Sequence, residues 1–175
     1  WGWVYGSTTH DQANILDVSA SDQELNYRAT IMWSFSEEGQ MYLTSSDATR
    51  PGGGNRSIPR STDPADVFGF ACNNDLNELG ISGNPTSYAG DSVENLELGL
   101  KMDPTSTFRV NASAYRIEWS DIQQLISTSG ACGFNFTANV GQAVSTGLEI
   151  EATAVFSENF SINAGVGYTK AEFTE

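Results

Sequence analysis

The sequence predicts an all-β protein, an antiparallel up-and-down sheet of the kind that forms a segment of a transmembrane β-barrel. Three observations lead to this prediction. Apolar and polar residues alternate over long stretches, short and long connections follow one another, and aromatic residues gather near the ends of the alternating stretches. Alternation with a period of two is the pattern of a β-strand, whose successive side chains point to opposite faces.

Five stretches alternate clearly, and a sixth, residues 40–48, is expected to be the strand that leads into the glycine run. In VENLELGLKM, for example, Leu96, Leu98 and Leu100 lie on one face, opposite Glu97 and Gly99. Most of these stretches are longer than the roughly five to six residues usual for strands of soluble proteins. The predicted strands are residues 25–35, 40–48, 93–102, 108–115, 145–156 and 159–169.

The connections between these stretches are of two kinds. Tight joins rich in turn-forming residues, typical of hairpins, are found at 36–39, 103–107 and 157–159. Long polar joins are found at 8–23, 50–92 and about 127–137. Because the two kinds alternate, we expect all short turns at one end of the sheet and all long loops at the other. Long loops in compact domains are usually functional.

The glycine run Gly52 to Gly54 lies where the second long join begins. A phosphate-binding loop would need Gly-Lys-Ser/Thr ahead of a helix, but Asn55 and Arg56 follow the glycines and Pro59 disfavours a helix. We therefore expect the glycines to let a strand leave the sheet and enter the loop. Strand-end packing is the expected role of Arg50 and Arg56, with contact to an anionic ligand as the alternative.

A membrane barrel and a soluble β-sandwich both show alternation. The length of the strands, the neutral and glycine-bearing polar face, and aromatic residues beside the short turns favour the barrel. The residues expected in the interfacial aromatic girdles are Phe35, Tyr42, Phe108, Trp119, Phe156, Phe160 and Tyr168. A secreted sandwich that binds glycans or proteins is the alternative, and a small complete barrel would need an eighth strand.

Composition excludes some classes of protein. The 175 residues carry 8 Lys+Arg against 22 Asp+Glu, a net charge of −14, which argues against a nucleic-acid partner. No apolar run reaches the length of about 18 residues expected of a membrane-spanning helix. The chain begins WGWVYGSTTH, without the pattern of a secretory signal, so we expect a processed start or a piece of a longer protein.

The two cysteines, Cys72 and Cys132, lie far apart in loop-like surroundings. Neither belongs to a Cys-x-x-Cys pair, which argues against zinc. Their surroundings favour a disulfide formed in an oxidising compartment, with two separate buried thiols as the alternative.

We expect no catalytic, cofactor-binding or metal site, and no enzymatic activity. The only histidine, His10, has no Ser or Cys partner in any motif, and is expected at the surface. The carboxylate pairs Glu37–Glu38 and Glu149/Glu151 are expected in a solvated turn and on the polar face of a strand. The loop carboxylates do not have the spacing of an EF-hand; they are Asp63, Asp66, Asp75, Glu78 and Asp91.

Four motifs follow one another in the order and spacing of a known family. The stretches MYLTSSDATRPGGGN, YAGDSVENLELGLKMDPTSTFRVNASAYRIEWSDIQQL and FTANVGQAVSTGLEIEATAVFSENFSINAGVGYTKAEF carry them, within residues 24–175. The matching positions are Tyr42, Ser46, Arg50, Pro51, Gly52 and Gly53, then Glu97, Gly99 and Lys101, then Tyr115, Trp119, Asp121, Ile122 and Gln123, and last Gly147 and Glu149. Together they resemble the C-terminal β-barrel portion of TonB-dependent outer-membrane receptors.

The resemblance implies an active importer in the outer membrane of a Gram-negative bacterium. Its expected cargo is a scarce solute of the iron–siderophore, cobalamin or glycan type. Its expected partners are outer-membrane lipid, a small solute such as a metal chelate, and the TonB–ExbB–ExbD complex, which supplies energy. The resemblance also implies that residues 50–92 and 127–137 face outside, tied together by a Cys72–Cys132 disulfide that shapes the entrance.

The same resemblance predicts that residues 1–175 are only part of a barrel domain. About seven strands are expected here, whereas plugged outer-membrane transporters have about 22. The N-terminal plug domain, the TonB box and the final strand are expected to lie outside this sequence. We therefore expect a fragment that does not transport by itself.

Overall fold

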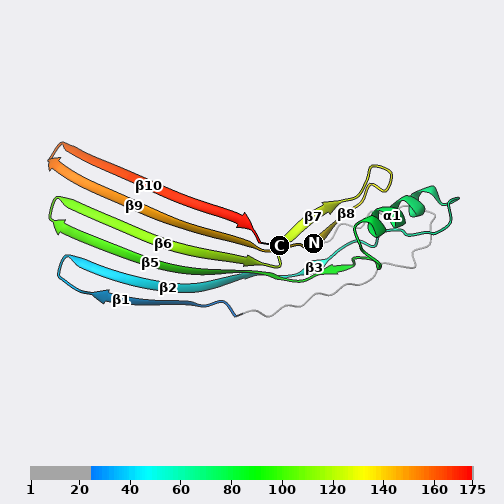
Figure 1. The fold of residues 1–175 in the computed structure, drawn as a ribbon, viewed down its shortest axis with the longest axis horizontal. Coiled ribbons are helices and arrows are strands. Elements are labelled where there is room, and N and C mark those ends of the chain that lie inside the picture. Colours follow the sequence, from blue (N-terminus) through cyan, green and yellow to red (C-terminus); the bar gives the residue numbers. More distant parts are fainter. Residues whose placement is uncertain (1–24, 175) are drawn as a thin grey trace, which may run out of the picture.

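The computed structural model describes residues 25–174, and its main feature is one antiparallel sheet of six strands in the order β1-β2-β5-β6-β9-β10. Each long strand pairs with the next long strand along the chain, so the sheet is an up-and-down meander (Figure 1). The strands are β1 (Arg28–Ser34), β2 (Gly39–Arg50), β5 (Asp91–Thr105), β6 (Phe108–Ser120), β9 (Ala143–Ser157) and β10 (Phe160–Phe173).

The observed strands confirm the predicted fold class. All six predicted stretches are strands, and five of the six observed strands have 12 to 15 residues. All three short turns lie at one end of the sheet and the long loops at the other (Figure 1). The described residues hold six long strands where about seven were expected for the whole chain, and the predicted join at 8–23 lies outside them.

The pairing register gives the sheet one apolar and one polar face, because residues paired across strands share a face. On the apolar face Leu43 pairs with Leu98, which pairs with Ala114, which pairs with Leu148. Leu98 is 48% exposed and Leu148 is 56% exposed. Within residues 25–174 no second sheet packs on this face, as a β-sandwich would require.

The register corrects part of the aromatic prediction. Tyr42 pairs with Gly99, and Trp119 pairs with Val93, so both aromatic side chains belong to the polar face and not to an outward girdle. Phe108 and Tyr168 are on the apolar face, where they pair with Ala154 and Leu148. Near the short turns, the Trp33 and Phe35 rings are 5.8 Å apart, and those of Phe156 and Phe160 are 5.5 Å apart. Periodicity gives the face of a residue only once the strand bounds and bulges are known.

The segment 50–92 is not the structureless polar loop that was expected. It contains helix α1 (Val67–Glu78) and two short strands, β3 (Gly53–Gly54) and β4 (Ser87–Tyr88), which pair with each other. The other long join is largely a hairpin of β7 (Gln123–Ser127) and β8 (Asn135–Asn139). None of the helices in the described residues is long and apolar enough to cross a membrane.

Local signals for α1 are present at its two ends. Asp66 is the N-cap, and its Oδ1 accepts a hydrogen bond from the Gly69 backbone N–H at 3.1 Å. Beyond the last turn, Gly80 has a φ of 74°, a left-handed conformation that commonly ends helices. The helix was missed because its residues do not show an apolar stripe at helical spacing: Val67 and Phe68 are exposed at its start.

Two tyrosines on the polar face lie over glycines of the neighbouring strand. A Cβ added at Gly99 would come 2.0 Å from Cζ of Tyr42, and one added at Gly147 would come 2.4 Å from Cζ of Tyr115. The tyrosine hydroxyls reach onward: Tyr42 donates to Glu97 Oε1 at 2.6 Å, and Tyr115 shares a 2.8 Å hydrogen bond with the Thr169 hydroxyl. Glycine at these positions is therefore required for the packing of the tyrosines.

We expect Gly99→Ala to lower the free energy of unfolding of the barrel by about 1–3 kcal/mol, the usual cost of overpacking. The added methyl group must displace the Tyr42 ring and with it the hydrogen bond to Glu97. Thermal unfolding of the full-length receptor in detergent measures the effect. Gly165→Ala is the matched control, because its Cβ would meet nothing nearer than 3.8 Å. Equal losses in the two variants would refute this explanation.

Candidate functional site: a two-loop body at one end of the sheet

The two long joins fold together into one unit, which we call the two-loop body and define as residues 51–90 and 121–142. Its buried core takes side chains from both joins: Ile58, Cys72 and Leu76 from the first, Cys132 and Phe136 from the second. These are five of the six buried hydrophobic residues of the described chain. The main buried core therefore lies in the loops and not on either face of the large sheet.

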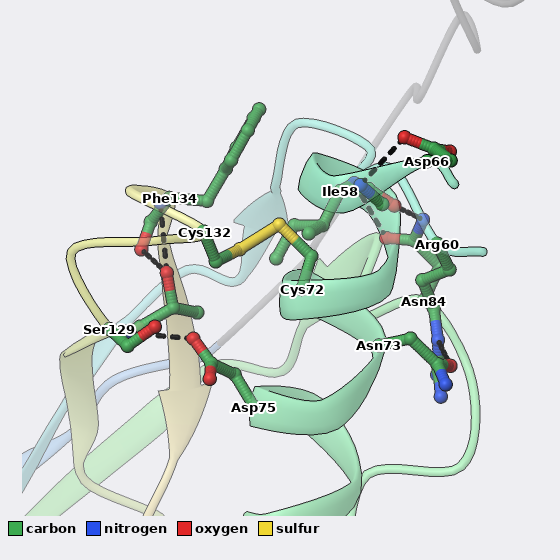
Figure 2. Close-up of a disulfide and its surroundings, with 12 residues drawn as sticks. Ile58, Arg60, Asp66, Cys72, Asn73, Asp75, Asn84, Ser129, Cys132 and Phe134 are labelled. Atoms are coloured by element: carbon green, nitrogen blue, oxygen red, sulfur yellow. Dashed lines mark hydrogen bonds between the residues drawn. A yellow bond between two sulfur atoms is a disulfide. The ribbon is translucent and has the colours of Figure 1, made fainter. Parts of the chain in front are cut away.

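A disulfide between Cys72 and Cys132 lies at the centre of this core (Figure 2). It joins α1 to the turn of the β7–β8 hairpin, across 60 residues of sequence. The two cysteines are 0% and 1% exposed. A reductant can therefore reach the sulfur atoms only when the body opens.

Polar contacts between the two joins surround the core. The Asn55 side chain makes two hydrogen bonds with the backbone of Thr137, each 2.8 Å long. Asn139 does the same for the backbone of Ala89, at 2.8 Å and 3.1 Å. The Ser129 backbone N–H donates to Asp75 Oδ2 at 2.7 Å, beside the disulfide (Figure 2). Each contact uses one partner from each join, so the joins hold a single relative position.

Arg60 fixes the later turns of α1 to the chain that follows the helix. Its guanidinium donates to the Asn73 side chain at 3.0 Å, to the Asn77 side chain at 2.8 Å and to the Gly83 carbonyl at 2.7 Å. These bonds use the planar, multi-donor geometry of arginine. Arg60 thus stabilises a helix that has few apolar contacts of its own outside the disulfide core.

The glycine run has a different role from the one predicted. A Cβ at Gly52 would come 2.4 Å from the Tyr88 carbonyl oxygen, and one at Gly53 would come 2.4 Å from the Tyr88 hydroxyl. Gly53 also pairs with Tyr88 in the β3–β4 ladder. Gly52 and Gly53 therefore allow the backbone of β4 at Tyr88 to approach closely, whereas the prediction was that they let the strand diverge from the sheet.

Asp91, the first residue of β5, anchors the two-loop body to the sheet. Its side chain is 3% exposed. It accepts hydrogen bonds from the Arg50 guanidinium Nε at 3.1 Å, the Trp119 indole Nε1 at 3.0 Å and the Gln123 backbone N–H at 3.2 Å. The Gln123 side chain donates in turn to the backbone carbonyls of Arg50, Pro51 and Ala89. One buried carboxylate therefore joins the loop ends of β2, β5 and β6 to the start of β7.

Hydrogen bonding keeps this carboxylate ionised. Burial alone raises the pKa of Asp91, but the bonds from Arg50, from the Gln123 backbone and from Trp119 outweigh it, so the pKa lies below its ordinary value. Asp91 is the residue of β5 nearest the loops. It lies beyond Glu94, a charged residue that marks the end of the apolar face on this strand, and therefore outside the membrane-spanning part of β5. The same ion pair raises the pKa of Arg50.

We expect the two-loop body to lose stability as the pH falls below about 4, the ordinary pKa of an aspartate. A carboxyl whose pKa is depressed by folding contributes stability above its unfolded-state pKa, and this is lost as the pH falls through the folded-state value. Hydrogen exchange of the loop amides, corrected for intrinsic rates, should be constant from about pH 5 to 8 and faster in acid. In Asp91→Asn, which cannot ionise, the part of the acid sensitivity due to this group should be missing. An unchanged profile in that variant would rule out Asp91 as its source.

The polar face of the sheet below the body carries a shallow groove of about 590 Å³. Hydroxyl, amide and charged side chains line it, among them Tyr42, Glu97, Lys101, Asn111, Tyr115 and Glu149. Lys101 Nζ lies 5.5 Å from the centre of the Tyr42 ring. Within residues 25–174 no group of three or more His, Cys, Asp or Glu side chains has the geometry of a metal site.

The structure brings together residues that the sequence placed in separate motifs. Arg50 meets Trp119 and Gln123 through Asp91, and Tyr42 lies over Gly99. Asp91 was missed as an anchor, because it was grouped with the loop carboxylates. The only feature of the sequence that could have indicated an anchoring role is its position at the start of an alternating stretch, directly after Gly90. Arg50 has the packing role that was expected, Arg56 is exposed, and the candidate His10 lies outside the described residues.

Comparisons with known proteins agree with this architecture. The family model for the TonB dependent receptor-like β-barrel matches residues 4–175. The ferric yersiniabactin uptake receptor FyuA of Yersinia pestis is 18% identical with a TM-score of 0.57, and the match covers 84% of this chain and 18% of that one. The FrpB iron transporter of Neisseria meningitidis is 19% identical with a TM-score of 0.56, covering 86% and 20%. Among curated proteins, no relative matches the chain.

A third structure, the ferric-catecholate import receptor Fiu of E. coli K12, is 15% identical with a TM-score of 0.54, covering 86% of this chain and 18% of that one. At these identities the likeness shows the fold alone. The chain spans about a fifth of the length of these structures. All three are named as transporters or uptake receptors.

An open, two-faced meander with its long loops at one end is a segment of the wall of a membrane β-barrel. The chain belongs to the TonB-dependent receptor β-barrel family. This family consists of outer-membrane transporters of Gram-negative bacteria and not of enzymes, in agreement with the prediction that the chain has no enzymatic activity.

Proposed function

We propose that this chain forms part of the wall and the outer entrance of an outer-membrane active transporter that imports a scarce solute. Iron–siderophore complexes, cobalamin and glycans are the candidate solutes. The three structural relatives described above are named for iron or ferric cargo, so iron chelates are the first to test.

One observation carries this proposal: the six-stranded sheet has a polar face, an apolar face that is uncovered within residues 25–174, and a folded body at its loop end. An apolar face of this kind suits lipid, and the polar face suits a water-filled or plugged lumen. In this arrangement the two-loop body lies outside the cell at the rim of the lumen. Because the disulfide and the Asn55 and Asn139 contacts hold it rigid, it restricts the shape of what enters.

The proposed partners follow from the same arrangement. Outer-membrane lipid covers the apolar face, and a small solute such as a metal chelate enters from the loop end. Energy comes from the TonB–ExbB–ExbD complex, through an N-terminal region outside residues 1–175. Nucleic acid is not an expected partner of a chain with a net charge of −14.

The test is fractionation of the native cells followed by uptake assays. An antibody against residues 51–90 should detect a detergent-extracted outer-membrane protein several times larger than this chain. Deletion of its gene should abolish growth on one limiting solute and uptake of that solute in labelled form, as should deletion of TonB. A soluble band of this chain's own size would refute the proposal and favour a secreted binding module.

A further inference from the structure

On β6, β9 and β10 the apolar face ends toward the loops in two rows of mostly polar residues. The pairing register puts Arg116 opposite Thr146, and Thr146 opposite Lys170, in one row across β6, β9 and β10. We call these three residues the basic row. The next row toward the loops contains Glu118, Val144 and Glu172 in the same order. Each basic residue thus has a glutamate two positions further along its own strand.

The basic row lies at the border of the apolar surface. The row before it contains Ala114, Leu148 and Tyr168, and Tyr168 is 65% exposed. Phe108 and Arg116 are both on this face of β6, and the eight residue-to-residue steps from one to the other span about 27 Å along the strand. With a strand tilt of about 40°, this is roughly 20 Å across the membrane, close to the top of an apolar band about 25 Å tall that begins at the short turns.

The basic side chains keep donors free for a ligand. Arg116 Nε donates to Glu118 Oε1 at 2.5 Å, which leaves the two terminal nitrogens of the guanidinium. Lys170 Nζ lies 2.8 Å from Glu172 Oε2, which uses one of its three donors. All four side chains are about half exposed. The glutamates draw the charged groups toward the loops and away from the apolar surface, as expected for basic residues at a membrane border.

We propose that the basic row, with Tyr168 beneath it, binds the phosphate of an anionic lipid headgroup in the outward-facing leaflet. Arg116 and Lys170 flank Thr146 at about 9.6 Å between the backbones of β6 and β10, so both long side chains can reach one phosphate above the Thr146 hydroxyl. Tyrosine is typical of this depth, where its ring meets acyl chains and its hydroxyl meets headgroups. This inference rests on the proposed membrane location.

Charge favours a lipid phosphate over a free anion. Asp47, Glu94, Glu118 and Glu172 all lie in the row above, and the chain carries a net charge of −14. A diffusing phosphate is repelled by this surface. A lipid, in contrast, is held by the contact of its acyl chains with the apolar face. This contact places its phosphate at the height of the basic row despite the negative charge of the neighbouring acidic row.

The experiment uses the full-length receptor in bilayers of phosphatidylcholine that contain a minor fraction of spin-labelled lipid. Electron spin resonance then compares association of labelled phosphatidylglycerol with that of labelled phosphatidylcholine. The wild type should prefer phosphatidylglycerol, and R116Q/K170Q should lose about fivefold per residue, or about 25-fold together. Arg109→Gln is the control, because Arg109 lies on β6 near the short turns and on the polar face.

A charge-balanced variant separates the basic donors from the overall field. R116Q/E118Q/K170Q/E172Q keeps the net charge and should still lose the preference. An unchanged preference in either multiple variant, or competition by inorganic phosphate, would overturn the inference. Folding is checked by thermal unfolding of each variant. Insertion without lipid preference overturns only this inference, whereas failure of the wild type to insert overturns the proposed function as well.

Discussion

Replacing both disulfide cysteines, as C72S/C132S, should open the two-loop body while leaving the six-stranded sheet folded. The disulfide is the centre of a small core to which the two joins contribute only three other buried side chains, Ile58, Leu76 and Phe136. A disulfide of this span typically contributes about 2–4 kcal/mol. The open form of the loops should therefore become roughly a hundredfold more populated.

Limited trypsin digestion on intact cells measures this change. Arg56 and Arg60 lie in the first join, and Arg60 is held by Asn73 and Asn77 in the closed body. Cleavage there should accelerate in the double variant, and Gly165→Ala, far along β10, should behave as wild type. Equal cleavage in all three proteins would mean that the polar contacts alone keep the joins together. Reduction of the wild type should have a slow effect only, because the sulfur atoms are buried.

Asp91→Ala should release the two-loop body from the sheet without opening the body itself. The substitution removes the acceptor of Arg50, Trp119 and the Gln123 backbone N–H at once. Leaving such partners unsatisfied costs about 3 kcal/mol in the stability of this junction. Asp91 is not part of the disulfide core or of the side chains packed against it, so this core should persist.

Hydrogen exchange followed by mass spectrometry distinguishes the two loop variants. In Asp91→Ala, peptides covering 119–127 should exchange faster while those covering α1 keep their protection. The opposite pattern is expected of C72S/C132S. Glu94→Ala serves as the control, since it removes an exposed carboxylate three residues along the same strand. If Asp91→Ala and Glu94→Ala exchanged alike, the anchoring role of Asp91 would be wrong.

The structure of the six-stranded sheet could be predicted from the sequence to a greater extent than that of the two-loop body. The alternation in VENLELGLKM and STGLEIEATAVF gave both the strands and their apolar faces, and β5 and β9 carry these faces as expected. Helix α1 could not be found in this way, because its burial depends on Cys72 and Leu76 meeting Phe136 from a distant segment. Its cap residues Asp66 and Gly80 were visible, but short polar segments often contain such residues without forming a helix.

Tyr42 and Trp119 illustrate the same limit at the level of single residues. Both are aromatic residues near strand ends, which favoured a place in the girdle. The face on which each side chain lies depends on strand bounds and register. Tyr42 packs over Gly99 of the neighbouring strand, and Trp119 donates a hydrogen bond to Asp91. A strand pattern cannot show which residue of the neighbouring strand lies opposite.

The antiparallel, two-faced sheet with long loops at one end could be predicted from the amino-acid sequence, because strand periodicity and turn chemistry are local properties of the chain. Its ordered motifs also identified the family. That the two joins form one disulfide-centred body, and that Asp91 holds this body to the sheet, became visible only in the folded chain. Those contacts link residues 28 to 82 positions apart, so they depend on register and on loop packing that no local pattern specifies.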